Sequence, residues 1–407
     1  MRTDMADLPS APRQRLRQRR RRLFVSLAIV FGLCFALGVL ELSFRLFWEI
    51  PPAMAGMDHV GLFAAGEDGT PMLAPGFRGE LQYGDGAPAR TSINSLGLRG
   101  PEAAARSPGQ RRVLVVGDSL PFGYGVEDDQ TFPFHLESRL RATGVDVVVG
   151  NAGVPGTGVS HAVARMRLLD RAFAPDAFVI CSYLGNDAID DALPARAVYG
   201  GLLHMWPMCD LVETSWRTRL AFRSRLAMWA EVWIFTNKPQ WSPLASVTLS
   251  PDVVQRAAGL PPDAQRGHGL FLDVRDRAHA WAPGAAPVVP RLLGYLRASL
   301  VQAMEVAAGR PVLFVILPTS AHVDTAKGLR MLQAWQWDPA DYEPGLARRR
   351  WQTVAEDLGI AAFDVTPSLR GAGQVEDLYL ADGGHFSVRG NELVGQWLAS
   401  EVARLLR

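Results

Sequence analysis

The chain has 407 residues, enough for one large domain or two ordinary ones, and its 48% hydrophobic and 20% charged residues are typical of a globular protein with a sizeable core. The net charge of +1 conceals an asymmetry: eight arginines and two aspartates lie within the first 22 residues, so the rest of the chain is mildly acidic. An acidic body argues against a nucleic-acid partner.

The basic cluster is followed by an apolar stretch. Leu23 to Leu40 is uncharged, and hydrophobic residues continue past Glu41 and Arg45 to Trp48. Those first 18 residues rise about 27 Å as a helix, and the extension reaches the roughly 30 Å of a bilayer core. We therefore expect residues 23–48 to form one transmembrane helix. Because arginines stay on the cytoplasmic side, residues 1–22 would be a cytoplasmic tail and the remaining chain would lie across the membrane.

A cleaved signal peptide is the alternative, because Ala53-Met54-Ala55 resembles a small-residue cleavage site. Cleavage sites follow the apolar region closely, whereas this one lies beyond Glu49 and two prolines. The sequence therefore favours an uncleaved anchor.

Residues 49–105 are rich in glycine, proline and alanine with weak periodicity, which predicts a linker and lead-in. Their last part, Thr91 to Glu102, reads TSINSLGLRGPE. We expect it to form a turn that packs ahead of the first strand.

From residue 106 onward, hydrophobic runs alternate with amphipathic stretches, as in βα units, so the predicted fold class is α/β. The predicted strands are Arg112–Val116, Val145–Val149, Ala177–Leu184, Val312–Leu317 and Ile360–Val365. The predicted helices, which would cover both faces of a parallel sheet, are Thr131–Thr143, Ala162–Phe173, Arg291–Ala308, Gly345–Leu358 and Asn391–Leu406.

Residues 188–290 interrupt this alternation, and a stretch of this length is too long for a plain loop. We expect an amphipathic helix at Ser215–Phe235 and irregular structure at Pro243–Gly284. The insertion is dense in tryptophan, for which three interpretations remain open: a small core of its own, which we favour, a wall that stacks on sugars, or contact with the membrane or a partner. The tryptophans are Trp206, Trp216, Trp229, Trp233, Trp241 and Trp281.

The three cysteines do not predict a disulfide framework. Cys34 lies in the apolar stretch. We expect Cys181 and Cys209 to be small buried hydrophobic residues, with a bridge between them as the alternative in an oxidising compartment.

Candidate catalytic groups lie at the two ends of the α/β region. The first strand runs into Gly117-Asp118-Ser119-Leu120, which would place the Ser119 hydroxyl at the carboxyl edge of the sheet, where ligands of open α/β folds bind. Asp382 precedes His385 by three residues, close enough to hold the imidazole in one tautomer. Together they supply the nucleophile, base and orienting acid that acyl transfer needs. The other seven histidines are better interpreted as surface or packing residues.

Two further segments, Asn151 to Gly156 and Gly185-Asn186-Asp187, supply candidate donors for an oxyanion. Gly153 competes with Gly156 for this role. We assign the Asp118 carboxylate to hydrogen bonding within its own turn. No cluster has metal-ligand spacing and no glycine loop suits a phosphate, so no metal or cofactor is implied.

These segments, in this order, resemble the four blocks of the SGNH (GDSL-type) hydrolases, and TSINSLGLRGPE resembles the lead-in of their bacterial membrane-anchored members. The resemblance implies a flavodoxin-like three-layer sandwich with a five-stranded parallel sheet. It also implies that the oxyanion hole consists of the Ser119 and Gly156 backbone N–H groups and the Asn186 amide. Gly156 is preferred because its spacing from Asn151 fits the family block.

From the residues and the resemblance together we expect a serine esterase in the bacterial inner membrane, with its domain in the periplasm, that hydrolyses or transfers an acyl group, acetyl being favoured, on a small molecule or glycan. One alternative is an O-acetyltransferase that works with machinery for an exported envelope polysaccharide. Another is a non-catalytic binding or assembly module, against which the intact Ser119, Asn186 and His385 argue.

Overall fold

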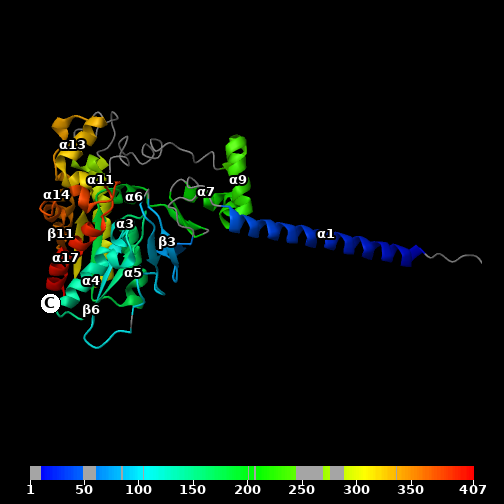
Figure 1. Ribbon diagram of the computed structural model, residues 1–407, viewed down its shortest axis with the longest axis horizontal. Coiled ribbons are helices and arrows are strands. Elements are labelled where there is room, and N and C mark those ends of the chain that lie inside the picture. The colour runs from blue at the N-terminus through cyan, green and yellow to red at the C-terminus, as the bar shows by residue number, and fades with distance from the viewer. Residues whose placement is uncertain are drawn as a thin grey trace, which may run out of the picture.

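The structure is a computed structural model that describes residues 11–48, 61–83, 86–103, 105–199, 201–205, 208–243, 269–275, 288–335 and 337–407. It shows an α/β body from which one long helix, α1 (Ala11–Phe47), projects (Figure 1). Outside these ranges lie Ala53-Met54-Ala55, Trp206, Trp281 and most of the stretch expected to be irregular, Pro243–Gly284.

The body is built on one parallel sheet with strand order β11-β10-β7-β5-β6. Numbered along the chain, this is the flavodoxin-like order in reverse, so the first strand, β5, lies in the interior between the second and the third. The strands are β5 (Arg111–Gly117), β6 (Val147–Gly153), β7 (Ala177–Tyr183), β10 (Val312–Leu317) and β11 (Ala361–Asp364).

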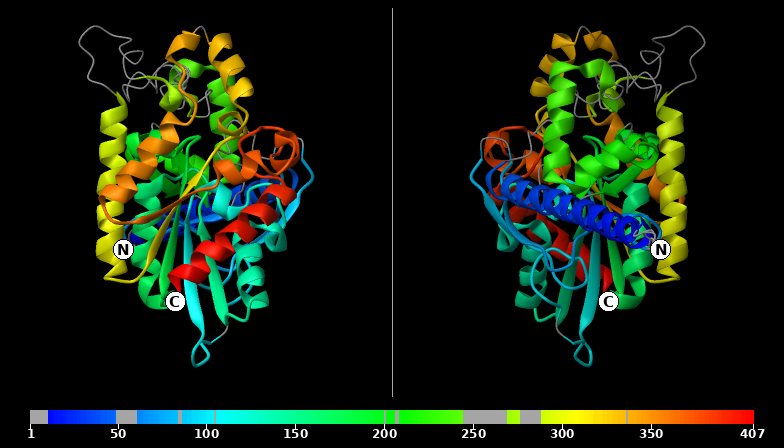
Figure 2. Two further views of the ribbon diagram at one scale, coloured as in Figure 1. Left: turned by 90° about the vertical axis from the view of Figure 1, so that its left-hand side faces the viewer. Right: turned by 90° about the vertical axis from the view of Figure 1, so that its right-hand side faces the viewer.

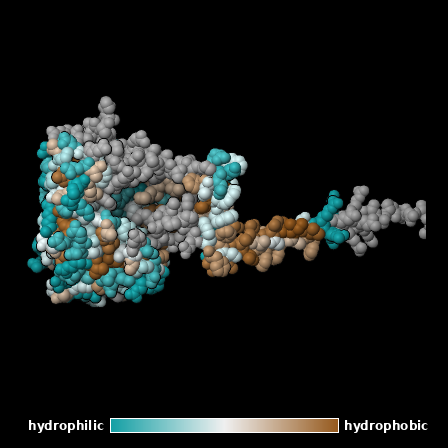
Figure 3. Space-filling view, turned by 45° about the horizontal axis from the view of Figure 1, so that its top comes forward, coloured by the Kyte–Doolittle hydropathy of each residue, from teal (hydrophilic) through white to brown (hydrophobic). Residues whose placement is uncertain are grey.

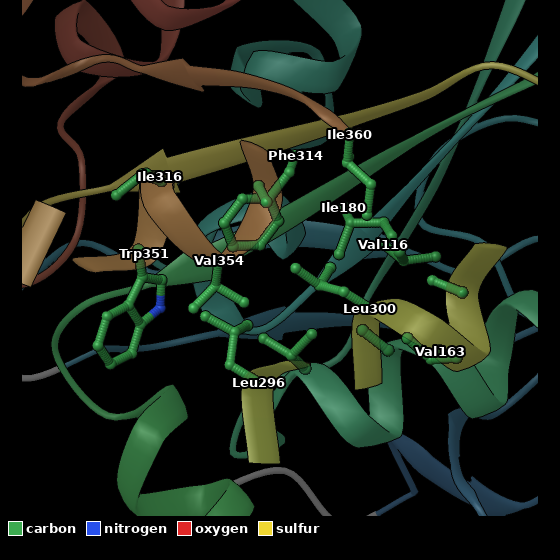
Figure 4. Close-up of a cluster of buried hydrophobic side chains, with 14 of the residues drawn as sticks. Val116, Val163, Ile180, Leu296, Leu300, Phe314, Ile316, Trp351, Val354 and Ile360 are labelled. Atoms are coloured by element: carbon green, nitrogen blue, oxygen red, sulfur yellow. The ribbon is translucent and has the colours of Figure 1, made fainter. Parts of the chain in front are cut away.

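Side chains of one strand alternate between two cores because successive residues point to opposite faces of a sheet. Leu114 and Val116 of β5 belong to one core. Figure 4 shows Val116 in this core with Phe314 and Trp351. This core lies under helices α5 (Val159–Phe173), α11 (Val288–Ala307) and α14 (Leu346–Asp357).

The neighbouring residues of β5, Val113 and Val115, point into the other core. Helices α4 (Phe132–Ala142) and α17 (Val388–Leu405) cover it, which completes a three-layer sandwich (Figure 2).

The predicted fold class is confirmed. All five predicted strands and five predicted helices of the α/β region are present, with ends displaced by a few residues. The largest displacement is in the second strand, which continues through Gly150 to Gly153, because those positions pair with β5 in spite of their low strand propensity. Helix α13 (Thr325–Ala334) was not predicted.

The segment interpreted as a linker contains folded structure. Strands β1 (Phe63–Ala65) and β2 (Pro71–Leu73) form one hairpin, and β3 (Arg78–Leu81) and β4 (Ala89–Ser92) form another. Their apolar side chains share a small core with Phe122 and Tyr124 of the loop that follows Ser119. Strands of three or four residues are too short to give a recognisable alternation of apolar and polar residues, so they could not be predicted from the sequence.

The described part of the insertion begins with a hairpin of β8 (Arg196–Tyr199) and β9 (Leu202–Met205). A helical subdomain follows the hairpin in the chain. The single predicted helix is wrong in one respect. It is broken into α8 (Trp216–Arg223) and α9 (Arg225–Asn237) at Ser224, whose hydroxyl accepts a hydrogen bond from the Ala227 N–H and so caps a new helix.

The subdomain has a small core, as favoured, but the described tryptophans of the insertion are not its buried members. That core consists of Leu202, Val212, Ala221, Phe222 and Met228. Trp216, Trp229, Trp233 and Trp241 are all exposed. The structure contains no disulfide between the buried Cys181 and Cys209.

Helix α1 contains the apolar stretch and is long and apolar enough, over Arg19–Phe47, to cross a membrane. None of its apolar window is buried against the body, and Figure 3 shows its hydrophobic side chains uncovered over most of its length. A helix that is apolar all round and unpacked is what a lipid environment requires.

Candidate active site

Ser119 lies at the carboxyl edge of the sheet, directly after β5. Gly117 adopts φ +153°, and a Cβ there would lie 2.8 Å from the Cys181 carbonyl oxygen, so glycine is required where the chain leaves the strand. The chain then turns into a short helix, α3 (Ser119–Phe122), whose first residue is the serine. This sharp exit presents the hydroxyl to the cleft.

Arg99 of the lead-in fixes the loop that follows α3. Its guanidinium is buried and donates to the carbonyl oxygens of Phe122, Gly123 and Val126 at 2.8, 2.6 and 2.6 Å. It also forms an ion pair with Asp128 at 2.8 Å. The lead-in motif therefore supports the serine loop, in addition to forming the expected turn.

The structure brings Ser119, His385 and Asp382 together. His385 Nε2 lies 2.9 Å from Ser119 Oγ, and His385 Nδ1 lies 2.6 Å from Asp382 Oδ2. Asp382 also accepts backbone hydrogen bonds from Gly384 and His385, so the acid and the imidazole are held in one tight loop. The three side chains form a continuous chain of hydrogen bonds, which is the geometry that activates a serine hydroxyl.

Tyr83 is a member of this site that the sequence analysis missed. Its hydroxyl donates to Asp382 Oδ2 at 2.7 Å, and its ring meets the His385 imidazole edge-on, with centroids 4.7 Å apart. It lies in the lead-in, nearly three hundred residues from its partner along the chain. No local motif marks it, and only the folding of the hairpins reveals it.

The charge of Asp382 is stabilised by these contacts. Partial burial acts to raise the pKa of Asp382, but the hydrogen bonds from His385 and Tyr83 outweigh it and hold the pKa well below its usual range. The carboxylate is therefore ionised and can accept from the imidazole.

The contacts of the Asp118 carboxylate extend beyond its own turn, to which the expectation confined them. It makes no capping hydrogen bond to α3. Besides its bond to the Ser119 backbone within the turn, the carboxylate accepts from the Gly156 N–H at 2.7 Å and from the Asn186 amide at 2.8 Å. All three groups expected to form the oxyanion hole thus point at one carboxylate.

Gly153 does not share this arrangement. Its N–H is directed at Asn151 Oδ1, 3.1 Å away, and a Cβ on Gly153 would lie 2.2 Å from the backbone nitrogen of Phe122. Its role is therefore close packing against α3, and of the two glycines only Gly156 presents its N–H to the acceptor beside Ser119.

Asn186 has no spare donor. Its amide nitrogen lies 2.8 Å from Asp118 Oδ2 and 2.5 Å from Asp190 Oδ2, so both of its hydrogens are engaged. Action on a substrate oxygen requires that one carboxylate release it. Whether Gly156 and Asn186 serve as oxyanion donors therefore stays a prediction.

Four buried aspartates surround this asparagine, namely Asp118, Asp187, Asp190 and Asp191. Two arginines oppose them: Arg196 bonds to Asp190 at 2.7 Å, and the fully buried Arg165 attracts Asp118 and Asp187. Two positive charges cannot balance four negative ones in a site shielded from water. Burial accordingly raises the pKa of all four acids, that of Asp190 to about 7 in spite of Arg196.

A cleft of about 250 Å³ opens over these groups. Tyr183 and Gly384 line it beside Ser119 and His385, and Met205 reaches it from the end of β9. The insertion therefore contributes a wall to the site. Among the described residues, no group of three or more His, Cys, Asp or Glu side chains is arranged to hold a metal ion.

We predict that Asp190→Asn changes how stability depends on pH. With a pKa of about 7 in the folded protein and about 3.8 when unfolded, Asp190 binds more protons in the folded state, so its contribution to stability declines as pH rises between these values. The free energy of unfolding of the wild type minus that of the variant should fall from pH 4 to pH 7 in chemical denaturation.

The control is Asp176→Asn. Partial burial acts to raise the pKa of Asp176, but Arg106 and other donors lower it, so its contribution is lost only in acid below its usual pKa. The free energy of unfolding of the wild type minus that of Asp176→Asn should stay constant from pH 5 to pH 7. If the corresponding free-energy difference for Asp190→Asn is also constant from pH 4 to pH 7, Asp190 stays ionised beside Arg196 and the prediction is wrong.

Comparison with known proteins gives limited sequence similarity. No family model matches the chain. An arylesterase from Vibrio mimicus is 29% identical over 102 residues, which are 25% of this chain and 50% of that protein. The chain thus matches about half the length of this curated relative.

Two solved structures align with most of the chain at low sequence identity. A lipase/acylhydrolase from Enterococcus faecalis aligns with 72% of this chain and 95% of its own, at 14% identity and a TM-score of 0.37. A lipolytic protein of the G-D-S-L family from Veillonella parvula aligns with 72% and 97%, at 14% identity and a TM-score of 0.34. In its four motifs the chain resembles the SGNH (GDSL-type) hydrolases, and its five parallel strands have the flavodoxin-like order that this resemblance implies.

Proposed function

We propose that this protein is a serine esterase or acyltransferase of the SGNH type, anchored in the bacterial inner membrane by α1 with its α/β domain in the periplasm. The observation that carries the catalytic part is the chain of hydrogen bonds from Ser119 through His385 to Asp382. A scaffold has no chemical need for a serine, an imidazole and a carboxylate in this order at the floor of a cleft.

In this mechanism His385 Nε2 takes the Ser119 proton as Oγ bonds to the ester carbonyl carbon. Asp382 accepts from Nδ1 and stabilises the imidazolium. When the tetrahedral intermediate collapses, the C–O bond to the alcohol breaks and His385 returns the proton to that oxygen. An acyl group then remains on Ser119 until water or another hydroxyl, deprotonated in turn by His385, attacks the acyl carbon. The bond from that carbon to Ser119 Oγ then breaks, and His385 returns the proton to Oγ.

The negative charge of the intermediate requires donors on its oxygen, each of which contributes about 10²–10³-fold. The Ser119 and Gly156 N–H groups and the Asn186 amide converge on Asp118, so they already form an anion-binding site beside the nucleophile. In our proposal the substrate oxygen takes these donors and the Asp118 carboxylate gives them up. Since burial raises the pKa of Asp118, protonation would weaken its hold on them.

The acyl acceptor separates the two enzymatic versions of the proposal, ester hydrolysis and O-acetylation of an exported polysaccharide. Products formed from an acetyl donor and an oligosaccharide would be analysed by mass spectrometry. Free acetate alone supports hydrolysis, and an acetylated oligosaccharide supports transfer.

The location is supported by the length and apolar character of α1, by the exposure of its whole apolar window, and by the arginines at its start. With those arginines in the cytoplasm, the α/β domain emerges on the periplasmic side.

Ser119→Ala should abolish turnover of a small acetyl ester, by about 10⁴-fold or more, because the nucleophile is lost. A fluorophosphonate probe should label the wild type and not this variant, while circular dichroism stays unchanged. Ser138→Ala on the exposed side of α4 is the control, which should be labelled and active like the wild type. A folded wild type that is not labelled would instead favour a non-catalytic module.

Tyr83→Phe should lower kcat by about tenfold with little change in KM, because one hydrogen bond that positions Asp382 is lost and a hydrogen bond contributes about 0.5–1.5 kcal/mol. Steady-state kinetics on the same ester measures both constants. Tyr295→Phe on α11, a partly exposed tyrosine outside the cleft, should leave both unchanged. An unaltered kcat in Tyr83→Phe would show that the contact does not serve catalysis.

A further inference from the structure

Large apolar side chains are exposed on the helical part of the insertion. On α9, Trp229 is 41% exposed and Trp233 is 52% exposed, and the two lie one turn apart on the same face. Trp216 and Leu220 of α8 and Trp241 are also exposed. A concentration of exposed tryptophan on one subdomain indicates an interaction surface for a protein, a membrane or a ligand.

This surface is attached to α1. The Glu41 carboxylate accepts from the Ser224 hydroxyl at 2.6 Å and from the backbone N–H groups of Arg225 and Leu226 at 3.0 Å each, so α1 caps the start of α9. Three residues after Glu41 on α1, the ring centroid of Phe44 lies 5.3 Å from the ring centroid of Trp229. The Trp229 face of α9 is therefore the face from which α1 departs.

The attachment point defines a depth in the membrane. Glu41 directly follows the uncharged stretch Leu23–Leu40, which rises about 27 Å against the roughly 30 Å of the hydrocarbon core. The start of α9 is thus held near the end of the hydrocarbon core, and the last residues of the expected transmembrane helix, 42–48, would lie at headgroup level. Figures 1 and 2 both show α9 crossing the end of α1 at a steep angle, so with α1 across the bilayer α9 runs along its surface.

The chemistry of the segment suits that position. Tryptophan is enriched at membrane–water interfaces, where its ring is accommodated at headgroup level. Residues 215–241 carry five basic residues and one acidic residue, Glu231. That acid is buried and paired with Arg217, which leaves exposed basic side chains such as Arg219 and Arg223 to attract anionic headgroups.

We infer that α8 and α9 form an interfacial platform that docks on the membrane leaflet at the C-terminal end of α1, with Trp229 and Trp233 inserted among the lipids. This inference rests on the proposed spanning of the membrane by α1. Because β9 of the same insertion places Met205 in the cleft, docking holds one wall of the candidate active site at a fixed height above the bilayer.

The test uses the full chain in nanodiscs of phosphatidylethanolamine and phosphatidylglycerol, with and without brominated acyl chains, which quench tryptophan on contact. The difference in tryptophan fluorescence between the wild type and the Trp229→Phe/Trp233→Phe double variant is the emission of these two rings. Brominated lipid should reduce this difference about twofold or more, as expected for rings at the interface. The control is Phe134→Trp, which adds a ring at an exposed position on α4. Its added emission should be quenched by aqueous acrylamide and not by brominated lipid.

The outcomes separate this inference from the proposal on which it rests. Protein that does not enter the nanodiscs at all would contradict both the anchor and the platform. Protein that enters while Trp229 and Trp233 remain quenched only by acrylamide would overturn the platform alone. Rings shielded from both quenchers would also overturn it, because another protein or a second copy would then cover them. Loss of Ser119 labelling would bear on catalysis and leave this result unaffected.

Discussion

The carboxylate of Asp118 joins three loops at the carboxyl edge of the sheet. It follows β5 directly, accepts from Gly156 in the loop after β6, and accepts from Asn186 in the loop after β7. The three strands are adjacent in the sheet, so their loops meet at one point, and a buried acceptor there must be satisfied by whatever donors converge on it. This single group therefore positions the donors around Ser119, and the site depends on it more than on any local motif.

Most of the fold and the four candidate segments could be predicted because they are encoded locally. Buried parallel strands such as Val312–Leu317 read as continuous hydrophobic runs, and Asp382 lies close enough to His385 to suggest their contact. Tyr83 could not be predicted, because its partner is distant in the chain. The same holds for Asp118, whose neighbours come from other strands. The sequence around Ser119 alone does not show which donors the Asp118 carboxylate accepts from.

The site is completed by segments outside the α/β core. Tyr83 comes from the lead-in hairpins, Arg99 from the motif that follows them, and Met205 from the insertion. These are the parts where sequence analysis was weakest, because short strands and a broken helix give no sustained periodicity. They are also the parts that connect the core to α1, so in our account the membrane and the active site are linked through the same segments.

The account is tested most directly by the crystal structure of the protein after reaction with a phosphonate, which leaves a charged oxygen where the oxyanion would form. We predict a phosphorus bonded to Ser119 Oγ, with its oxygen about 2.7–3.1 Å from the Gly156 nitrogen and the Asn186 amide and the Asp118 carboxylate displaced from both. An adduct whose oxygen points to solvent while Asp118 keeps both donors would contradict the proposed oxyanion hole. The absence of any adduct on Ser119 would contradict the proposed nucleophile.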